Sequence, residues 1–332
     1  MSAEAQRGAV PPDHVPVMRD AMLSLLAPRD GGIYVDGTFG GGGWSRALLE
    51  AASCVVYGID RDAAALRAGG ALAARFEGRL VLLHGRFAEM ATLLAPHRVN
   101  AVDGIALDLG LSSVQLDDGA RGFSFRLDGP LDMRMDQDDH GPTAADLVNG
   151  ETEDALAALI ADFGEERRAR AIARAIVAAR ADAPITRTGQ LAAIVRRAAA
   201  GRSRRGIDPA TRTFQALRIG VNDEIGEIER GLGEVERLLR PGGRVLVVSF
   251  HSLEDRPVKR FFRERSGHGH GQPNRHEPGS ATKSPDPTFR LLTRRARRPD
   301  PVEVSGNPRA RSARLRAAER TAAPPWQERL VA

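Results

Sequence analysis

Four short apolar runs lie in the first third of the chain, and three of them end in an aspartate. They span residues 33–36, 55–60, 80–83 and 105–108. Continuous apolar character over so few positions is typical of strands that are buried on both faces of a parallel sheet. The intervening stretches 44–52 and 63–76 are compatible with helices. This alternation predicts a doubly wound α/β sheet.

A fifth apolar run, 244–249, comes much later and follows Pro241-Gly242-Gly243, which predicts a tight turn after a helix. Between the fourth and fifth runs, residues 151–201 are rich in alanine and arginine and predict several helices, one with Ile172 and Ile176 on a shared face. We therefore expect an all-helical domain over 136–210, inserted between two parts of the sheet domain, 14–135 and 211–320.

The stretch 213–239 spaces its apolar side chains three or four residues apart, which predicts one helix packed on the sheet. These side chains are Phe214, Leu217, Val221, Ile225, Ile228, Leu232 and Val235.

Two polar stretches predict disorder: an N-terminal tail, 1–13, and a loop rich in glycine, proline and histidine, 266–287. His268, His270 and His276 in that loop could bind a metal, but the loop offers neither an ordered scaffold nor acidic partners. We predict no metal site.

A chain of 332 residues that is 42% hydrophobic suggests about two globular domains. Its single cysteine, Cys54, excludes an internal disulfide and favours a reducing compartment. No apolar stretch resembles a signal peptide or a membrane span. These features predict a cytoplasmic protein with no membrane partner.

The net charge of +5 is unevenly distributed, because residues 290–320 hold ten arginines against three acids. Arginine makes forked contacts with phosphate, so this basic arm favours a polyanionic partner such as RNA. The alternative stays open that arginine is simply the default cation on solvated faces, since Lys259 and Lys283 are the only lysines.

A glycine-rich turn follows the first strand, from Asp36 to Gly43. Glycine lets the backbone approach a ligand closely, and a turn beside a helix N-terminus suits the polar end of a nucleotide-like cofactor. The glycines fit neither Gly-x-Gly-x-x-Gly nor Gly-x-x-x-x-Gly-Lys. Asp36 would repel a phosphate but favour the positive aminoacyl end of S-adenosylmethionine, which is therefore the predicted cofactor.

Acidic and imidazole side chains stand at the ends of further strands. Asp60, after the second strand, is predicted to accept hydrogen bonds from ribose hydroxyls; the alternative is that it caps the helix beginning near Asp62. Asp108 ends the fourth strand and His251 follows the fifth. Their alternatives are a loop-capping carboxylate and a turn histidine next to a capping Ser252. Ligands of open α/β sheets bind outside the carboxyl ends of strands, so these groups are expected to converge.

Eight strings of the sequence, in chain order, resemble the bacterial MraW/RsmH family. They are HVPV at 14–17, DGTFG at 36–40, DLGLSSVQLD at 108–117, RGFSF at 121–125, GPLDMRMD at 129–136, TRTFQA at 211–216, SFHSLED at 249–255 and NPRARS at 307–312. The resemblance implies a Rossmann-like class I methyltransferase domain with an inserted helical domain. It also implies S-adenosylmethionine-dependent methylation of N4 of a cytidine in the decoding centre of 16S ribosomal RNA, within the small ribosomal subunit. The oligomeric state stays open, with a homodimer among the options.

The resemblance also implies a set of cofactor contacts, which fall on Gly42, Gly43, Trp44, Asp60, Phe87, Asp108 and Gln115. The family usually has histidine at the position of Trp44, so only a contact through the backbone would survive there. Phe87 would cover the adenine; its alternative is core packing.

The exocyclic amine of cytosine is a weak nucleophile, so an acceptor near it is needed to restore its basicity. Asp108, together with the carbonyl of Leu109, is the candidate, although the segment lacks the Asp/Asn-Pro-Pro-aromatic string of many amino methyltransferases. Phe123 and Phe125 are candidate platforms for a flipped base, or else pin a loop. Two other functions remain as alternatives: a small-molecule methyltransferase and a non-catalytic ribosome assembly factor.

Overall fold

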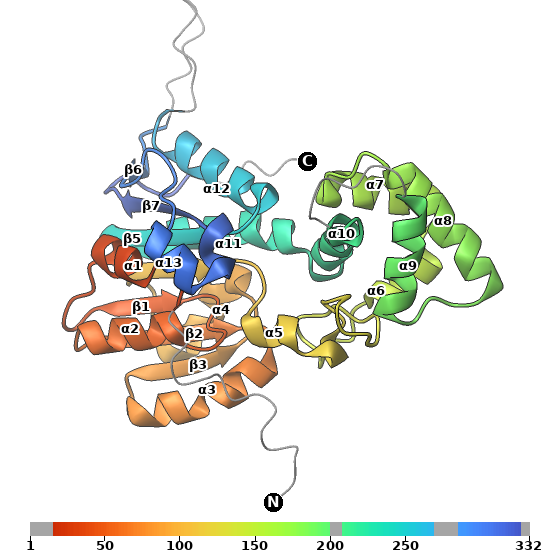
Figure 1. Cartoon of the computed structure of the whole chain (residues 1–332). Coiled ribbons are helices and arrows are strands. Elements are labelled where there is room, and N and C mark those ends of the chain that lie inside the picture. The colour runs from red at the N-terminus through yellow and green to blue at the C-terminus, as the bar shows by residue number, and fades with distance from the viewer. Residues whose placement is uncertain (1–15, 200–207, 269–284, 327–332) are drawn as a thin grey trace, which may run out of the picture. The chain divides into compact units, whose positions relative to one another are not determined.

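The computed structural model describes residues 16–199, 208–268 and 285–326, which form two compact units (Figure 1). The sheet unit holds the described residues up to Gly110 and those from Ile225 onward, and the helical unit is Leu111–Glu224. The predicted tail 1–13 and most of the predicted loop 266–287, with His270 and His276, lie outside the described residues. No described helix is both long enough and apolar enough to cross a bilayer.

The sheet unit is built on a seven-stranded sheet with the order β3-β2-β1-β4-β5-β7-β6. The strands are β1 Ile33–Asp36, β2 Val55–Asp60, β3 Leu80–His84, β4 Val102–Asp108, β5 Leu239–Ser249, β6 Phe289–Leu291 and β7 Arg314–Arg320. Neighbours from β3 to β5 run parallel, whereas β7 is antiparallel to both β5 and β6. The predicted Rossmann-like α/β sheet is confirmed, with two strands that the sequence pattern did not predict.

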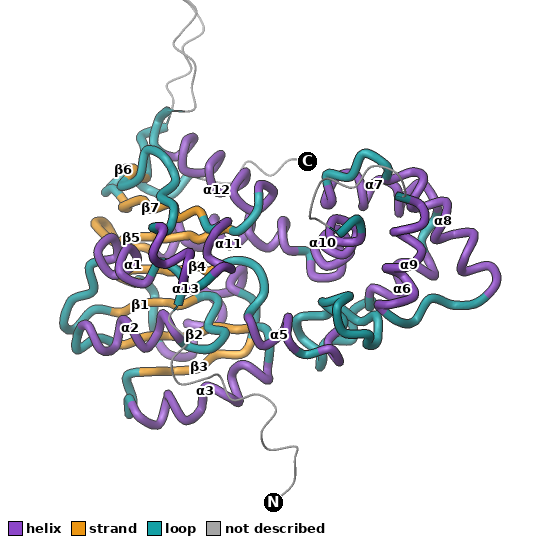
Figure 2. Tube along the Cα trace, in the orientation of Figure 1, coloured by secondary structure: helices purple, strands orange, loops and turns teal. Residues whose placement is uncertain are grey.

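Helices cover both faces of this sheet (Figure 2). One layer contains α1 Arg19–Leu26, α2 Gly43–Ala51 and α3 Ala63–Arg75; the other contains α4 Met90–Leu94, α11 Glu224–Leu238 and α12 Ser252–Arg265. Along β4, Ala106 faces the first layer while Ile105 and Leu107 face the second, and all three are fully buried. Burial on both faces explains why these strands are continuously apolar.

The segment predicted as a basic arm, 290–320, is not a separate arm. It supplies most of β6, the short helix α13 Pro301–Gly306 and all of β7. Leu315, Ala317 and Ala318 of β7 are fully buried, while Arg314 and Arg316, on either side of Leu315, pair with Asp255. The strand was missed because its buried positions are mostly alanine, a residue that is depleted in strands.

β5 begins earlier than predicted, because Pro241, Gly242 and Gly243 lie inside the strand rather than in a turn before it. The register with β4 shifts between Val102 and Gly104 at this point. Gly242 has a φ of 80°, which favours glycine, so the predicted turn is an irregularity within the strand.

The helical unit consists of helices and their loops. The helices are α5 Ser113–Asp117, α6 Ala144–Gly150, α7 Glu153–Gly164, α8 Ala169–Asp182, α9 Thr188–Ala198 and α10 Ala210–Asn222. Ile172 and Ile176 share one face of α8, as predicted, and both are fully buried. The predicted insert 136–210 lies inside this unit, which extends beyond it at both ends because Leu131, Met133 and Phe214 belong to the same hydrophobic core.

The prediction of one helix over 213–239 is wrong. The chain breaks at Asp223, which has a φ of 50° and separates α10 from α11. Phe214 and the first part of the apolar stripe pack in the helical unit, whereas Ile228 and Leu232 pack against the sheet. Arg218 of α10 donates two hydrogen bonds of 2.7 Å to Glu224, the first residue of α11.

Candidate active site

The glycine-rich turn after β1 is held by the buried carboxylate of Asp36. Its Oδ2 accepts hydrogen bonds from the amide of Ser45 at 3.1 Å and from its hydroxyl at 2.7 Å. Because Ser45 lies in the first turn of α2, the carboxylate caps that helix from the strand end. Burial raises the pKa of Asp36 to about 6, even though the bonds from Ser45 and Thr38 act in the opposite direction.

The end of β2 is joined directly to this turn. Oδ2 of Asp60 accepts a hydrogen bond of 2.6 Å from the amide of Gly40, and Oδ1 accepts one of 2.8 Å from the amide of Asp62. Burial raises the pKa of Asp60 to about 6. Asp62 itself caps α3 by accepting from Ala64 at 3.0 Å, so the alternative that Asp60 is the helix cap is wrong.

Asp108 at the end of β4 carries an unsatisfied buried oxygen. Its amide donates to Oγ1 of Thr38 at 2.6 Å, which brings β4 up to the glycine-rich turn. Within the described residues, its Oδ1 is buried and has no hydrogen-bond partner. Burial, followed by the negative charges of Asp36 and Glu254, holds the pKa of Asp108 well above its usual range. A loop-capping role therefore finds no support in the hydrogen bonds of the described chain.

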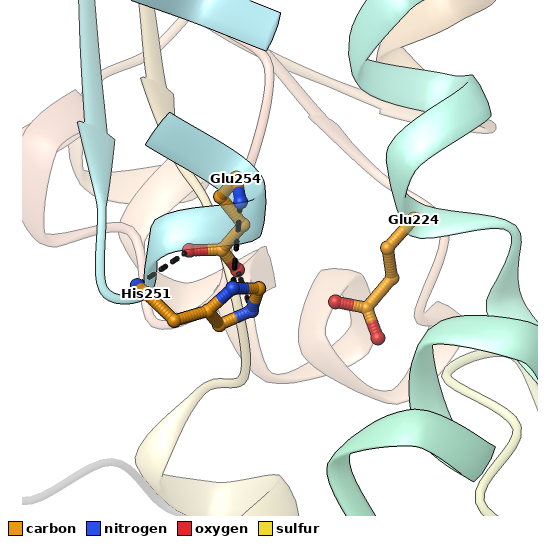
Figure 3. A group of neighbouring side chains, drawn as sticks. All are labelled: Glu224, His251 and Glu254. Carbon is orange, nitrogen blue, oxygen red and sulfur yellow. Dashed lines mark hydrogen bonds and ion pairs between the residues drawn. The ribbon is translucent and has the colours of Figure 1, made fainter. Parts of the chain in front are cut away.

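His251 and Glu254 form a reciprocal cap at the start of α12 (Figure 3, which also draws Glu224). Nδ1 of His251 accepts from the amide of Glu254 at 3.4 Å, and Oε2 of Glu254 accepts from the amide of Phe250 at 2.8 Å. Nε2 of His251 lies 3.0 Å from Oε1 of Glu254. The cap is thus His251 rather than Ser252. Glu254 is fully buried, and its position three residues after the cap is the sequence signature of a capping box.

The glycines predicted to contact the cofactor are needed for packing within the protein. Gly42 has a φ of 71°, and a Cβ there would lie 2.7 Å from the side chains of Leu72 and Phe39. A Cβ on Gly43 would lie 3.0 Å from Pro16. A larger residue at 42 would therefore disturb the turn itself, whatever ligand the turn binds.

Two aromatic side chains of the predicted contact set are core residues. Trp44 is buried, and its Nε1 donates to the carbonyl of Val17 at 3.2 Å. Only its backbone, in the first turn of α2, is left for a ligand. The ring of Phe87 packs against α11, where a Cβ on Gly231 would lie 2.4 Å from it. The core-packing alternative therefore describes the position of Phe87 in this structure.

Three more residues singled out from the sequence lie in the helical unit. Gln115 closes the cap of α5, because its side-chain oxygen accepts from the amide of Ser112 at 3.1 Å. Phe123 is buried, and Phe125 packs edge to face on Phe214 with ring centroids 5.0 Å apart. These contacts favour the alternative that the two rings pin a loop.

Within the sheet unit, the ends of β1, β2, β4 and β5 do converge, as predicted. The group is acidic: Asp36, Asp60 and Asp108 end β1, β2 and β4, and Glu254 lies in the first turn of α12, which follows β5. The charged neighbours that shift the pKa of Asp36 and Asp108 are all carboxylates. Such a surrounding is unfavourable to a phosphate and favours a ligand that carries positive charge.

Known proteins similar to this chain cover nearly all of it. The sequence model of a family described as the MraW methylase family matches residues 12–321. A ribosomal RNA small subunit methyltransferase H from Rhodospirillum centenum is 59% identical, with 98% of each chain covered. The protein of the same name from Rhodospirillum rubrum is 56% identical over 94% of this chain and 96% of its own. Among solved structures, an rRNA methylase from Streptococcus thermophilus aligns with a TM-score of 0.40 at 11% identity, covering 91% of this chain and 93% of its own.

Proposed function

Because the chain belongs to the MraW methylase family, we propose that it transfers a methyl group from S-adenosylmethionine to RNA of the small ribosomal subunit. The acceptor that we propose is the N4 amino group of a cytidine in the decoding centre, as the resemblance of the sequence strings implies. Such a protein would act in the cytoplasm, where small subunits are assembled.

The observation that carries this proposal is the unpartnered buried oxygen of Asp108 within an acidic group. S-adenosylmethionine is a sulfonium cation with a charged amino group, and the carboxylates at the strand ends fit such a ligand. Asp60 would hold the ribose hydroxyls, since each of its oxygens accepts one backbone hydrogen bond and retains a lone pair. The backbone of Gly42, Gly43 and Trp44 would meet the aminoacyl end.

Bound S-adenosylmethionine supplies an already electrophilic methyl group, so the protein mainly orients the acceptor and removes a proton. As the nitrogen of the acceptor forms its bond to the methyl carbon, the bond from that carbon to the sulfonium sulfur would break, and the nitrogen loses one proton. Oδ1 of Asp108 takes that proton, because this oxygen is buried and has no competing partner within the described residues. The amide of Leu109 donates to the carbonyl of Val248 at 2.9 Å, which fixes the backbone next to Asp108. The carbonyl of Leu109 is the second candidate acceptor.

Transfer of labelled methyl to purified small subunits that lack the modification tests this proposal. We expect label in the RNA, and nucleoside analysis to recover it as N4-methylcytidine. Label in another nucleoside would refute the proposed acceptor atom but support RNA as the substrate. Turnover that needs no RNA would indicate a small-molecule methyltransferase, and failure to bind S-adenosylmethionine would indicate a non-catalytic assembly factor.

A further inference from the structure

Four exposed arginines follow β6 closely and differ from the paired arginines of β6 and β7. They are Arg294, Arg295, Arg297 and Arg298, hereafter the arginine loop. Within the described residues, none of their side chains has a hydrogen bond or ion pair. By contrast, the strand arginines nearby are paired: Arg290 with Glu319, and both Arg314 and Arg316 with Asp255. The arginine loop therefore carries positive charge that its own surroundings do not use.

The acidic residues that follow the arginine loop are occupied by other groups. Oδ1 of Asp300 accepts from the amide of Glu303 at 2.8 Å and caps α13. Oε1 of Glu303 accepts from the amide of Met18 at 2.5 Å. Because these carboxylates hold backbone amides, they are not free to turn toward the arginines. The local field of the loop thus remains positive.

The backbone of the arginine loop is fixed to the sheet. The amides of Leu292 and Thr293 both donate to the carbonyl of Ala317, at 3.0 and 3.1 Å. Arg297 and Leu315 exchange two backbone hydrogen bonds of 2.9 Å each. A charged loop that is held at both of these points presents its side chains from a fixed position, so less conformational entropy is lost on binding than for a free tail.

The sheet register relates this loop to Asp108. Arg297 is bridged to Leu315, Leu315 pairs with Val248, and Val248 pairs with Asp108. These four residues form one row across the sheet, and at about 4.8 Å between neighbouring strands the backbones of Arg297 and Asp108 are roughly 14 Å apart. The arginine loop therefore lies along the same edge of the sheet unit as the candidate active site.

We propose that the arginine loop binds phosphates of the substrate RNA and guides the strand along the carboxyl-end edge of the sheet toward Asp108. The inference rests on the proposed function, because it takes the substrate to be RNA. Guanidinium groups make forked, charge-assisted bonds to phosphate. Several of them along one edge of the sheet therefore suit an RNA backbone that runs past the candidate active site. The contact is to the backbone, so it adds affinity without reading the base sequence.

The test compares two variants of the full chain that lose equal charge. In the first, Arg294, Arg295, Arg297 and Arg298 are all changed to glutamine. In the control, glutamine replaces Arg75, Arg98, Arg237 and Arg263, four exposed arginines that are remote from the arginine loop in sequence. Binding to small-subunit RNA is measured from low to high salt, alongside S-adenosylmethionine binding as a check on folding.

We expect the loop variant to bind RNA about tenfold or more weakly near physiological salt, with the slope of log K against log salt smaller by about 2. The control should stay within about twofold of the parent protein, and both should bind S-adenosylmethionine normally. Equal salt slopes for the loop variant, the control and the parent would overturn the inference. The arginine loop would then be an ordinary solvated surface. If the parent protein itself showed no methyl transfer or no RNA binding, the proposed function would be refuted instead.

Discussion

The amide of Gly40 donates a 2.6 Å hydrogen bond to Oδ2 of Asp60, so the end of β2 holds the turn that follows β1. The residue proposed to bind the ribose and the turn proposed to bind the aminoacyl end are therefore parts of one arrangement. The other oxygen of Asp60 accepts from Asp62 at the start of α3, which fixes the orientation of the carboxylate. A substitution of Asp60 should therefore weaken the contacts to both the ribose and the aminoacyl end of the cofactor.

Asp60→Asn is expected to weaken S-adenosylmethionine binding by about 10- to 100-fold. The amide nitrogen cannot accept a hydrogen bond, so one of the two backbone donors loses its partner, and a bond to a charged acceptor contributes about 1.5–3 kcal/mol. Isothermal titration calorimetry measures the change in affinity.

Asp62→Ala is the matched control for Asp60. It removes the side-chain cap of α3 and should lower the free energy of unfolding by about 1 kcal/mol while leaving cofactor affinity within about twofold. Equal losses of affinity in the two variants would mean that Asp60 acts through the fold of α3 rather than on the cofactor.

Asp108→Asn is expected to lower turnover by about 100-fold or more while S-adenosylmethionine affinity stays within a few-fold. The amide cannot take the proton of the acceptor amine. It should not harm folding, because a neutral group replaces a carboxyl whose Oδ1 is buried without a partner in the described chain. Single-turnover rates on small subunits, with melting temperatures alongside, separate these effects. Normal turnover in this variant would remove Asp108 from the mechanism.

The strand ends that carry the site could be predicted because each strand is buried on both faces. Ile33–Asp36 and Val55–Asp60 have the bounds that the apolar runs indicated, and the order of a doubly wound sheet then brings Asp36, Asp60 and Asp108 to one edge. The local sequence pattern was sufficient for these strands, since burial on both faces alone determines their apolar character.

Other features depend on tertiary contacts that no local pattern records. The apolar stripe through 213–239 is continuous, yet Asp223 adopts a left-handed conformation and divides the stripe between two cores. Trp44 and Phe87 gave no sign in the sequence that their rings turn into the core, because an apolar side chain beside a ligand and one beside a helix look alike. Glu254 could have been found from the spacing of its capping box.

Trp44→His, which introduces the residue that the family resemblance leads us to expect, should destabilise the protein without weakening cofactor binding. The indole is buried and bonds Val17, so a smaller polar ring would cost about 2–4 kcal/mol, as large-to-small core substitutions do. Thermal unfolding and calorimetry measure the two quantities, and Trp44→Phe should lose less stability. An affinity loss in the histidine variant with an unchanged melting temperature would show that the side chain contacts the ligand after all.

Glu254→Gln is expected to move the acid limb of the turnover profile to lower pH. Asp108 must be ionised to take a proton, so the rate rises as pH passes the pKa of this group, which burial and the charges of Asp36 and Glu254 hold high. Removing one neighbouring negative charge lowers that pKa, and ionised Asp108 then persists at lower pH. The glutamine oxygen can still accept from Phe250, which preserves the cap. Single-turnover rates across pH measure the shift, with Asp255→Asn as the adjacent control; an unchanged acid limb in Glu254→Gln would exclude this electrostatic coupling.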